Sequence, residues 1–181
     1  MDSYAKLARI REALRKKSGL KLSFRDVILE LINERLESAQ IDDRLRRFIE
    51  RVVAALAAIE GIEGVLLFGS VAKGTYNEYS DIDLLVVVKH KNRKTIEKIF
   101  SAVSSLDEES KELMNLGLPS LVSPIILDED EIKVFRPFYF DLADYGLVLY
   151  ERGRVLSDFI RSMKWTTHRR EVVNGVEVVT W

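Results

Sequence analysis

The first third of the chain is patterned for helices. From residue 41 to residue 59 apolar residues recur at helical spacing, and the pattern stops at Gly61, which predicts an amphipathic helix against a sheet. Two earlier helices are predicted over residues 3–17 and 23–36. We interpret residues 1–60 as an N-terminal helical segment. Its first two helices either cover the sheet, the interpretation we favour, or form a hairpin that binds a partner.

Two apolar runs without helical spacing follow, over residues 65–68 and 84–88. Continuous runs of this length, rich in Val and Leu, predict strands of a sheet that is packed on both faces. A third strand is predicted over residues 118–127. Pro119 and Pro124 indicate an edge or bulged position for it, because proline cannot donate a hydrogen bond to a neighbouring strand.

The rest of the chain alternates short helices and strands. In order, the pattern predicts a long helix over residues 95–116 with an acidic interruption at 107–109, a short helix capped by Asp128 and Glu131, a helical turn over 137–144, a strand over 146–150, a helix over 155–163, and a hairpin of residues 169–173 and 176–181 around Asn174-Gly175. The fold class is α/β (α+β), a small mixed β-sheet with an N-terminal helical extension and a C-terminal β-hairpin. We place the core at residues 61–150 and the C-terminal helix and hairpin at residues 151–181.

Composition narrows the classes of protein. A chain of 181 residues with 47% hydrophobic content suits one domain with a small appended element. It has no cysteine, which excludes thiol chemistry, zinc–thiolate sites and disulfides. No apolar run approaches the ~18 residues of a membrane span, and residues 1–6 lack an apolar leader core, so we expect a cytoplasmic protein without a membrane partner. The net charge of -1 gives no global attraction to nucleic acid.

Candidate chemistry lies between the first two strands. Gly69 and Ser70 follow the first strand, and such a turn offers backbone N–H groups and a hydroxyl to phosphate oxygens. Asp81 and Asp83 open the second strand. Carboxylates two residues apart on a strand share one face, roughly 7 Å apart at ~3.3 Å per residue. That spacing can hold one or two Mg²⁺ ions, so the two elements together indicate chemistry on a nucleotide.

The motif Phe68-Gly69-Ser70, ten further residues and Asp81-Ile82-Asp83-Leu84 resembles the signature of the polymerase-beta-like nucleotidyltransferase superfamily, in particular its small single-domain members. The resemblance implies a sheet of the nucleotidyltransferase type and transfer of a nucleoside monophosphate from a nucleoside triphosphate such as ATP to a hydroxyl acceptor, with release of pyrophosphate. It implies that Gly69, Ser70 and Lys73 bind the nucleotide, and that Asp81 and Asp83 are catalytic and bind Mg²⁺.

Active members of that superfamily generally supply a third carboxylate from a later strand. In this chain the expected position falls near Ser123. Asp128 at the end of that strand either swings into the site or, the interpretation we favour, caps the short helix that follows. The departure supports a second interpretation, a catalytically weak, antitoxin-like subunit that binds a partner and regulates it.

The residues do not identify the acceptor of the nucleoside monophosphate. The resemblance allows RNA or tRNA, a protein hydroxyl or a small molecule, and a helical toxin-type protein as partner. A third interpretation is an RNA-binding accessory protein that uses Trp165 beside a basic tail of Arg161, Lys164, Arg169 and Arg170. Self-association is also open, since the edge of the tail hairpin could pair with a second copy.

Overall fold

The computed structural model describes residue 36 and residues 41–164, 169–173 and 176–180. The predicted helix over residues 3–17 lies outside the described residues, as do all but the last residue of the helix over 23–36, the Asn174-Gly175 turn and Trp165. The described elements are α3 (Asp43–Ala57), β1 (Ile62–Phe68), α4 (Gly69–Lys73), β2 (Ile82–Val88), α5 (Arg93–Ser104), α6 (Asp107–Asn115), β3 (Val122–Asp128), the 3₁₀ helix η1 (Glu131–Lys133), α7 (Tyr139–Tyr145), β4 (Leu147–Glu151), α8 (Val155–Lys164), β5 (Arg169–Val173) and β6 (Val176–Thr180).

Four strands form one mixed sheet in the order β3-β2-β1-β4. The central strand β1 is antiparallel to both β2 and β4, whereas β2 and β3 are parallel and are joined by a crossover through α5 and α6. The small mixed sheet is therefore confirmed. So is the edge position of β3, where Pro124 interrupts no hydrogen bonding of a central strand.

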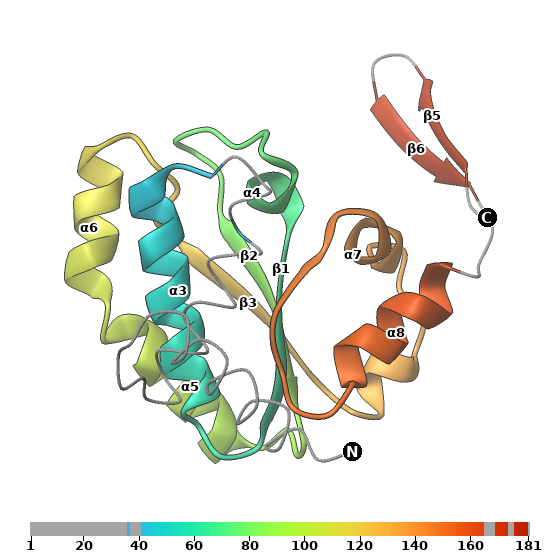
Figure 1. Ribbon diagram of the computed structural model, residues 1–181, viewed down its shortest axis with the longest axis horizontal. Helices are drawn as coiled ribbons and strands as arrows, with labels where there is room; N and C mark the ends of the chain where they lie inside the picture. The colour runs from blue at the N-terminus through green and yellow to red at the C-terminus, as the bar shows by residue number, and fades with distance from the viewer. Residues whose placement is uncertain (1–35, 37–40, 165–168, 174–175, 181) are drawn as a thin grey trace, which may run out of the picture.

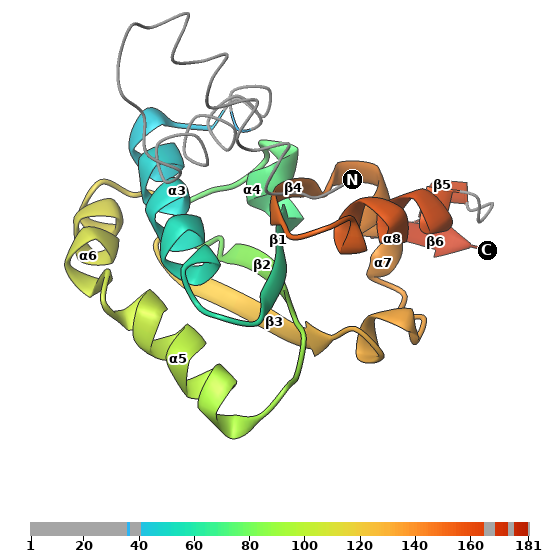
Figure 2. The same cartoon turned by 60° about the horizontal axis from the view of Figure 1, so that its bottom comes forward.

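The sheet is covered on both faces, as its apolar strands predict. Helices α3, α5 and α6 lie on one side of the strands and α7 and α8 on the other (Figures 1 and 2). Alternate residues of β2 divide accordingly: Leu84 and Val86 belong to the core cluster under α3, and Leu85 and Val87 to the cluster under α7 and α8. Because side chains on both faces of each strand are buried, the strands appear in the sequence as continuous apolar runs.

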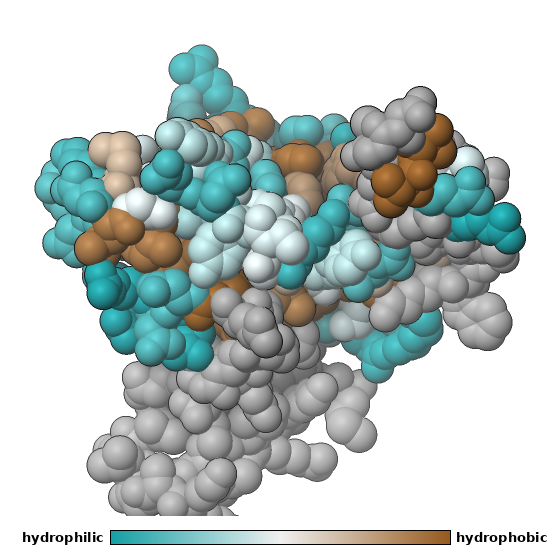
Figure 3. All heavy atoms as spheres, turned by 90° about the horizontal axis from the view of Figure 1, so that it is seen from above, coloured by the Kyte–Doolittle hydropathy of each residue, from teal (hydrophilic) through white to brown (hydrophobic). Residues whose placement is uncertain are grey.

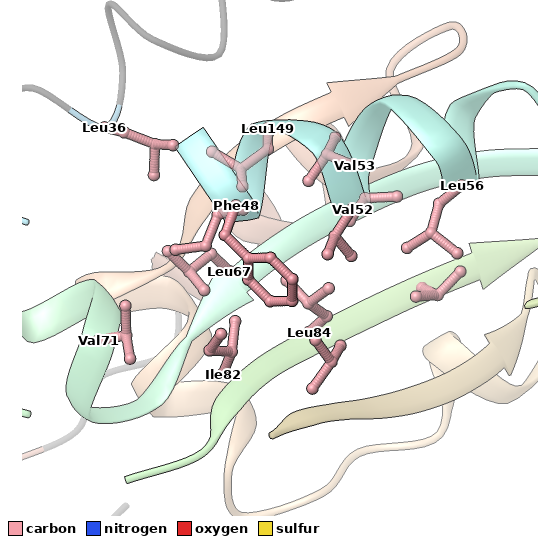
Figure 4. Close-up of a cluster of buried hydrophobic side chains, with 14 of the residues drawn as sticks. Leu36, Phe48, Val52, Val53, Leu56, Leu67, Val71, Ile82, Leu84 and Leu149 are labelled. Carbon is pink, nitrogen blue, oxygen red and sulfur yellow. The ribbon is translucent and has the colours of Figure 1, made fainter. Parts of the chain in front are cut away.

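Helix α3 is held on the sheet by its apolar face. Six of its residues are buried: Leu45, Phe48, Ile49, Val52, Val53 and Leu56. Figure 4 shows Phe48 and Val52 above Leu67 of β1 and Leu84 of β2. Each such side chain contributes about 1.5–3 kcal/mol of hydrophobic stabilisation on burial. The helix begins after Asp42, whose carboxylate accepts the Arg44 N–H at 2.8 Å.

The long helix predicted over residues 95–116 is two helices. Helix α5 starts at Arg93, where the Asn92 side chain accepts the Thr95 N–H at 3.0 Å, and it ends at Ser104. Helix α6 then begins with Asp107, the first of three consecutive acids. Negative side chains stabilise the first turn of a helix through its dipole, so the acidic interruption marks a new N-terminus.

The C-terminal third follows the prediction closely. The Asp128 N–H donates to Glu131 Oε2 at 3.1 Å while the Glu131 N–H donates to Asp128 Oδ1 at 2.8 Å, which is a capping box at η1. Strands β5 and β6 pair in antiparallel register as a separate two-stranded sheet (Figure 1). On the face shown in Figure 3, apolar side chains lie in separate patches between larger hydrophilic areas.

No helix among the described residues is long and apolar enough to cross a membrane. The division of the chain at residues 60 and 150 stays a prediction.

Candidate active site

The antiparallel pairing of β1 with β2 brings the Gly69-Ser70 turn next to Asp83. Phe68, the last residue of β1, is the register partner of Asp83, so Gly69 lies directly against that carboxylate. A methyl group on Gly69 would overlap Asp83 Oδ2 and would lie 3.0 Å from Cγ, and the Gly69 φ angle is +71°. Only glycine combines this backbone conformation with this close approach. The glycine of the motif is thus explained by the acid fourteen positions later.

The predicted Gly-Ser turn is the first turn of the short helix α4. Val71 and Ala72 are buried, which fixes the helix on the core, and Gly74 ends it in the left-handed conformation with φ +69°. Ser70 is half-buried. The N–H groups of a first helical turn have no acceptor within the helix. The first turn of α4 therefore keeps the free backbone N–H groups that the sequence analysis expected to bind phosphate.

Asp81 and Asp83 flank Ile82, which is fully buried and points into the cluster under α3 (Figure 4). By the alternation of a strand, both half-buried carboxylates lie on the opposite face, the one covered by α7 and α8. Burial, and then the charge of Asp81, raise the pKa of Asp83 above its ordinary 3.8. Among the described residues, no basic side chain forms an ion pair with either acid.

The loop that delivers Asp81 is fixed from within. The Asn77 N–H donates to Ser80 Oγ at 3.0 Å, and the Tyr79 N–H donates to Asn77 Oδ1 at 2.9 Å. Tyr76 ties the loop to α3, because its hydroxyl accepts the backbone N–H of Asp42 at 2.9 Å. These bonds set the direction from which the chain enters β2.

The third position holds a serine. Ser123 is the register partner of Asp83 in the parallel β2–β3 pair, and in the described part of the chain no three acids or histidines come together as a metal site. Asp128 is paired with Val88 at the far end of β2, roughly 17 Å from Asp83 at ~3.3 Å per residue. It is bound in the capping box, so it cannot complete the site.

The two acids nevertheless fit a magnesium ion that arrives with a nucleotide. Mg²⁺ prefers oxygen ligands and is usually held by one or two carboxylates together with substrate phosphates. Burial and, second, the charge of Asp81 raise the pKa of Asp83, and a bound cation would counteract both by favouring the ionised carboxylate. Asp81 and Asp83 are the residues that would hold it.

Lys73 is not free in the structure. Its Nζ donates to Asp141 Oδ2 at 3.2 Å and lies 4.8 Å from the centre of the Tyr145 ring. Both partners belong to α7. The sequence did not indicate them, since Asp141 is 68 positions away from Lys73 and no local pattern distinguishes it from the other acids of the chain.

The model of the nucleotidyltransferase domain family matches residues 45–145, more than half of the chain. The chain belongs to the nucleotidyltransferase domain family. This confirms the resemblance drawn from the motif, and it confirms a nucleotidyltransferase at the level of the family. The matched range runs from α3 through α7 and includes the motif and both partners of Lys73.

Two curated proteins of Methanocaldococcus jannaschii, both named as candidate protein adenylyltransferases, are similar to this nucleotidyltransferase. One is 26% identical over 108 residues, which are 55% of this chain and 66% of that protein. The other is 33% identical over 90 residues, 48% of this chain and 77% of that protein. The chain thus spans about two thirds of the first relative and about three quarters of the second.

Two solved structures are similar as well. A toxin–antitoxin crystal structure with AMP-PNP aligns at 19% identity and a TM-score of 0.41, over 63% of this chain and 84% of that one. A mutant of the MntA–HpeT toxin–antitoxin aligns at 18% identity and a TM-score of 0.40, over 62% and 83%.

Proposed function

We propose that this nucleotidyltransferase transfers AMP from magnesium-bound ATP to a hydroxyl group of a protein and releases pyrophosphate. The observation that carries the proposal is the contact of Gly69 with the carboxylate of Asp83. It joins the phosphate-binding turn to a pair of acids that no described cation neutralises. Family membership supports the reaction class. The names of the two relatives support ATP as the nucleotide and protein, rather than RNA or a small molecule, as the acceptor.

In this proposal each group of residues has a separate role, which follows from its place in the fold. The first-turn N–H groups of α4 and the Ser70 hydroxyl bind the terminal phosphates, and the Lys73 ammonium adds positive charge there. Asp81 and Asp83 are the residues that would hold Mg²⁺ beside the triphosphate. Bound Mg²⁺ would neutralise the negative charge that develops on the phosphates.

The acceptor is placed in line with the bond to be broken. Its hydroxyl oxygen bonds to the α-phosphorus, the bond from that phosphorus to the bridging oxygen breaks, and the hydroxyl proton passes to solvent. Without a carboxylate at Ser123 the reaction relies on positioning and charge neutralisation, which supply most of the acceleration in phosphoryl-type transfer.

One observation favours a second function. Since the described residues offer only two acids to a metal, the chain could bind a nucleotide without turnover and act as a regulatory subunit for a partner. The resemblance names a helical toxin-type protein as such a partner, and self-association through the tail hairpin also stays a prediction.

The test is calorimetric titration of ATP, GTP, CTP and UTP into the wild type, with and without Mg²⁺. We expect ATP to bind at roughly micromolar to millimolar affinity in the presence of Mg²⁺. Asp83→Asn should weaken this binding by about a hundredfold. Ser70→Ala should have a milder effect, because one of several phosphate contacts is lost. Asp128→Asn is the matched control, the same chemical change at the other end of the sheet, and should bind ATP as the wild type does.

Turnover separates the two functions. With ATP labelled at the α-phosphate and a whole-cell extract, label should appear in the protein fraction with wild type and not with Asp83→Asn. Nucleotide binding without label in protein, RNA or small molecules would support the regulatory subunit. No binding of any nucleotide would exclude both.

A further inference from the structure

Helix α7 borders the candidate active site from the same face of the sheet as the two acids. Phe68, the register partner of Asp83, stacks on Phe138 with ring centres 6.0 Å apart, and Phe138 immediately precedes α7. Phe68 belongs to the core cluster on the α7 and α8 side, and the partly buried Phe138 packs against that cluster. The helix is thus anchored on the residue that leads into the phosphate-binding turn.

From this anchored position α7 engages Lys73 twice. Asp141 accepts a hydrogen bond from Nζ at 3.2 Å, and the Tyr145 ring lies 4.8 Å from the same atom. Asp141 and Tyr145 are four positions apart on α7, so they share one face of that helix. The Lys73 and Asp141 side chains are 24% and 33% exposed, which shields their charges partly from water and strengthens their attraction.

Lys73 leaves α4 on the face that also carries Ser70. The two residues are three positions apart, on one side of the helix, while Val71 and Ala72 turn into the core. A lysine ammonium has three N–H donors. One donor is directed to Asp141 and the ring of Tyr145 lies beside the ammonium, which leaves a further donor for an acceptor such as a phosphate oxygen. An unrestrained lysine would have to lose much rotamer freedom before it could bind phosphate there.

We propose that Asp141, together with Tyr145, is a positioning residue that holds the Lys73 ammonium ready for the terminal phosphates of the nucleotide. The inference rests on the proposed function and adds to it a role for α7, which lies outside the motif. Asp141 touches neither the phosphates nor the reacting atoms. It acts through the side chain of Lys73.

The test measures the affinity for inorganic tripolyphosphate and the KM for magnesium-bound ATP in the full chain. Asp141→Asn should weaken tripolyphosphate binding and raise KM by about threefold to tenfold, and leave kcat within about twofold. Asp141→Glu should recover most of the loss. The control is Asp158→Asn on α8, which breaks an exposed ion pair with Arg154 of the same 3.2 Å length and should change neither quantity.

A double-mutant cycle separates positioning from a structural role. In a Lys73→Met background, Asp141→Asn should have no further effect on KM or on tripolyphosphate binding. An equal loss in both backgrounds, or an unchanged or lower KM for Asp141→Asn alone, would overturn the inference. If Asp141→Asn does not fold, Tyr145→Leu replaces it in the same cycle with the same expectations.

Failure of the proposed function gives a different result. If the wild type binds neither tripolyphosphate nor ATP, both the proposed function and the role of Asp141 are excluded. If the wild type binds both and Asp141→Asn is silent, the positioning role alone is excluded.

Discussion

The acidic residues at the two ends of the four-stranded sheet differ in whether a basic side chain pairs with them. At the start of β2, Asp81 and Asp83 lie together without a described basic partner, and burial and the charge of Asp81 raise the pKa of Asp83. At the opposite end, Lys91 lies 2.9 Å from Glu131 and its hydrogen bond lowers the pKa of that carboxyl. Asp128 completes the capping box there.

The difference indicates which acids serve stability and which serve a ligand. At the end of β3 and just after it, Asp128, Asp130 and Glu131 accept hydrogen bonds from lysines or from backbone N–H groups. At the start of β2, burial and the charge of Asp81 disfavour the ionised form of Asp83, and groups with perturbed pKa values cluster at functional sites. Substitutions at the two ends should therefore have opposite consequences for stability and for nucleotide binding.

Gly69→Ala should have the largest effect. The left-handed backbone costs an L residue about 1–2 kcal/mol, so we expect the unfolding free energy to fall by that amount. A methyl group would also displace Asp83, so we expect magnesium-bound ATP to bind roughly a hundredfold more weakly. Urea unfolding and calorimetry measure the two. Gly153→Ala is matched, because Gly153 has φ +74° and nothing within 4 Å. It should lose stability and keep ATP binding; equal ATP binding in both variants would contradict the role of the Gly69 contact.

Ser123→Asp should make the site more like that of the three-acid members of the family. Register places residue 123 beside Asp83, so the new carboxylate would add a third oxygen ligand. We expect Mg²⁺ to bind about tenfold more tightly in the absence of nucleotide, at a cost in stability from the added like charge. Calorimetry with Mg²⁺ alone tests this. Unchanged affinity would mean that the side chain at 123 does not reach the two acids.

Asp128→Ala should weaken the fold and spare the site. The carboxylate accepts the N–H groups of Asp130 and Glu131 at 3.0 and 2.8 Å, and loss of such a cap costs about 1 kcal/mol. Unfolding in urea should show that loss, while ATP affinity stays within about twofold of the wild type. A large loss of ATP affinity would break the division between the two ends of the sheet.

The pH dependence of stability should differ in sign at the two ends. The raised pKa of Asp83 means that its contribution to stability is fully present below pH 3.8 and is lost as pH rises through the raised value. The hydrogen bond from Lys91 holds the pKa of Glu131 below 4.5, so that contribution is present above pH 4.5 and is lost as pH falls through the lowered value.

Relative to the wild type, Asp83→Asn should therefore become more stable as pH rises above 3.8, whereas Glu131→Gln should become less stable as pH rises toward 4.5. Urea midpoints between about pH 3 and about pH 7 measure both trends. Parallel trends for the two variants would show that the ends of the sheet are electrostatically alike.

Much of the architecture was predictable because its signals are local. The apolar runs of β1 and β2, the prolines of the edge strand and the Asp128–Glu131 box all act within a few residues of the positions they control. The same holds for the motif that identified the family. The prediction of a single helix over residues 95–116 was wrong. Three consecutive acids can interrupt a helix or begin a new one, and the spacing of the apolar residues is the same in both cases.

The sequence alone determined the periods of its elements, the placement of Gly69 and Ser70 after a strand, and the spacing of Asp81 and Asp83. These depend on neighbours along the chain. The tertiary structure decided which groups meet: Gly69 against Asp83, Ser123 instead of an acid in register with it, and Lys73 against Asp141. Such contacts follow from strand order and from the path of α7 across the sheet. They join residues up to 68 positions apart, and no local propensity acts over that distance.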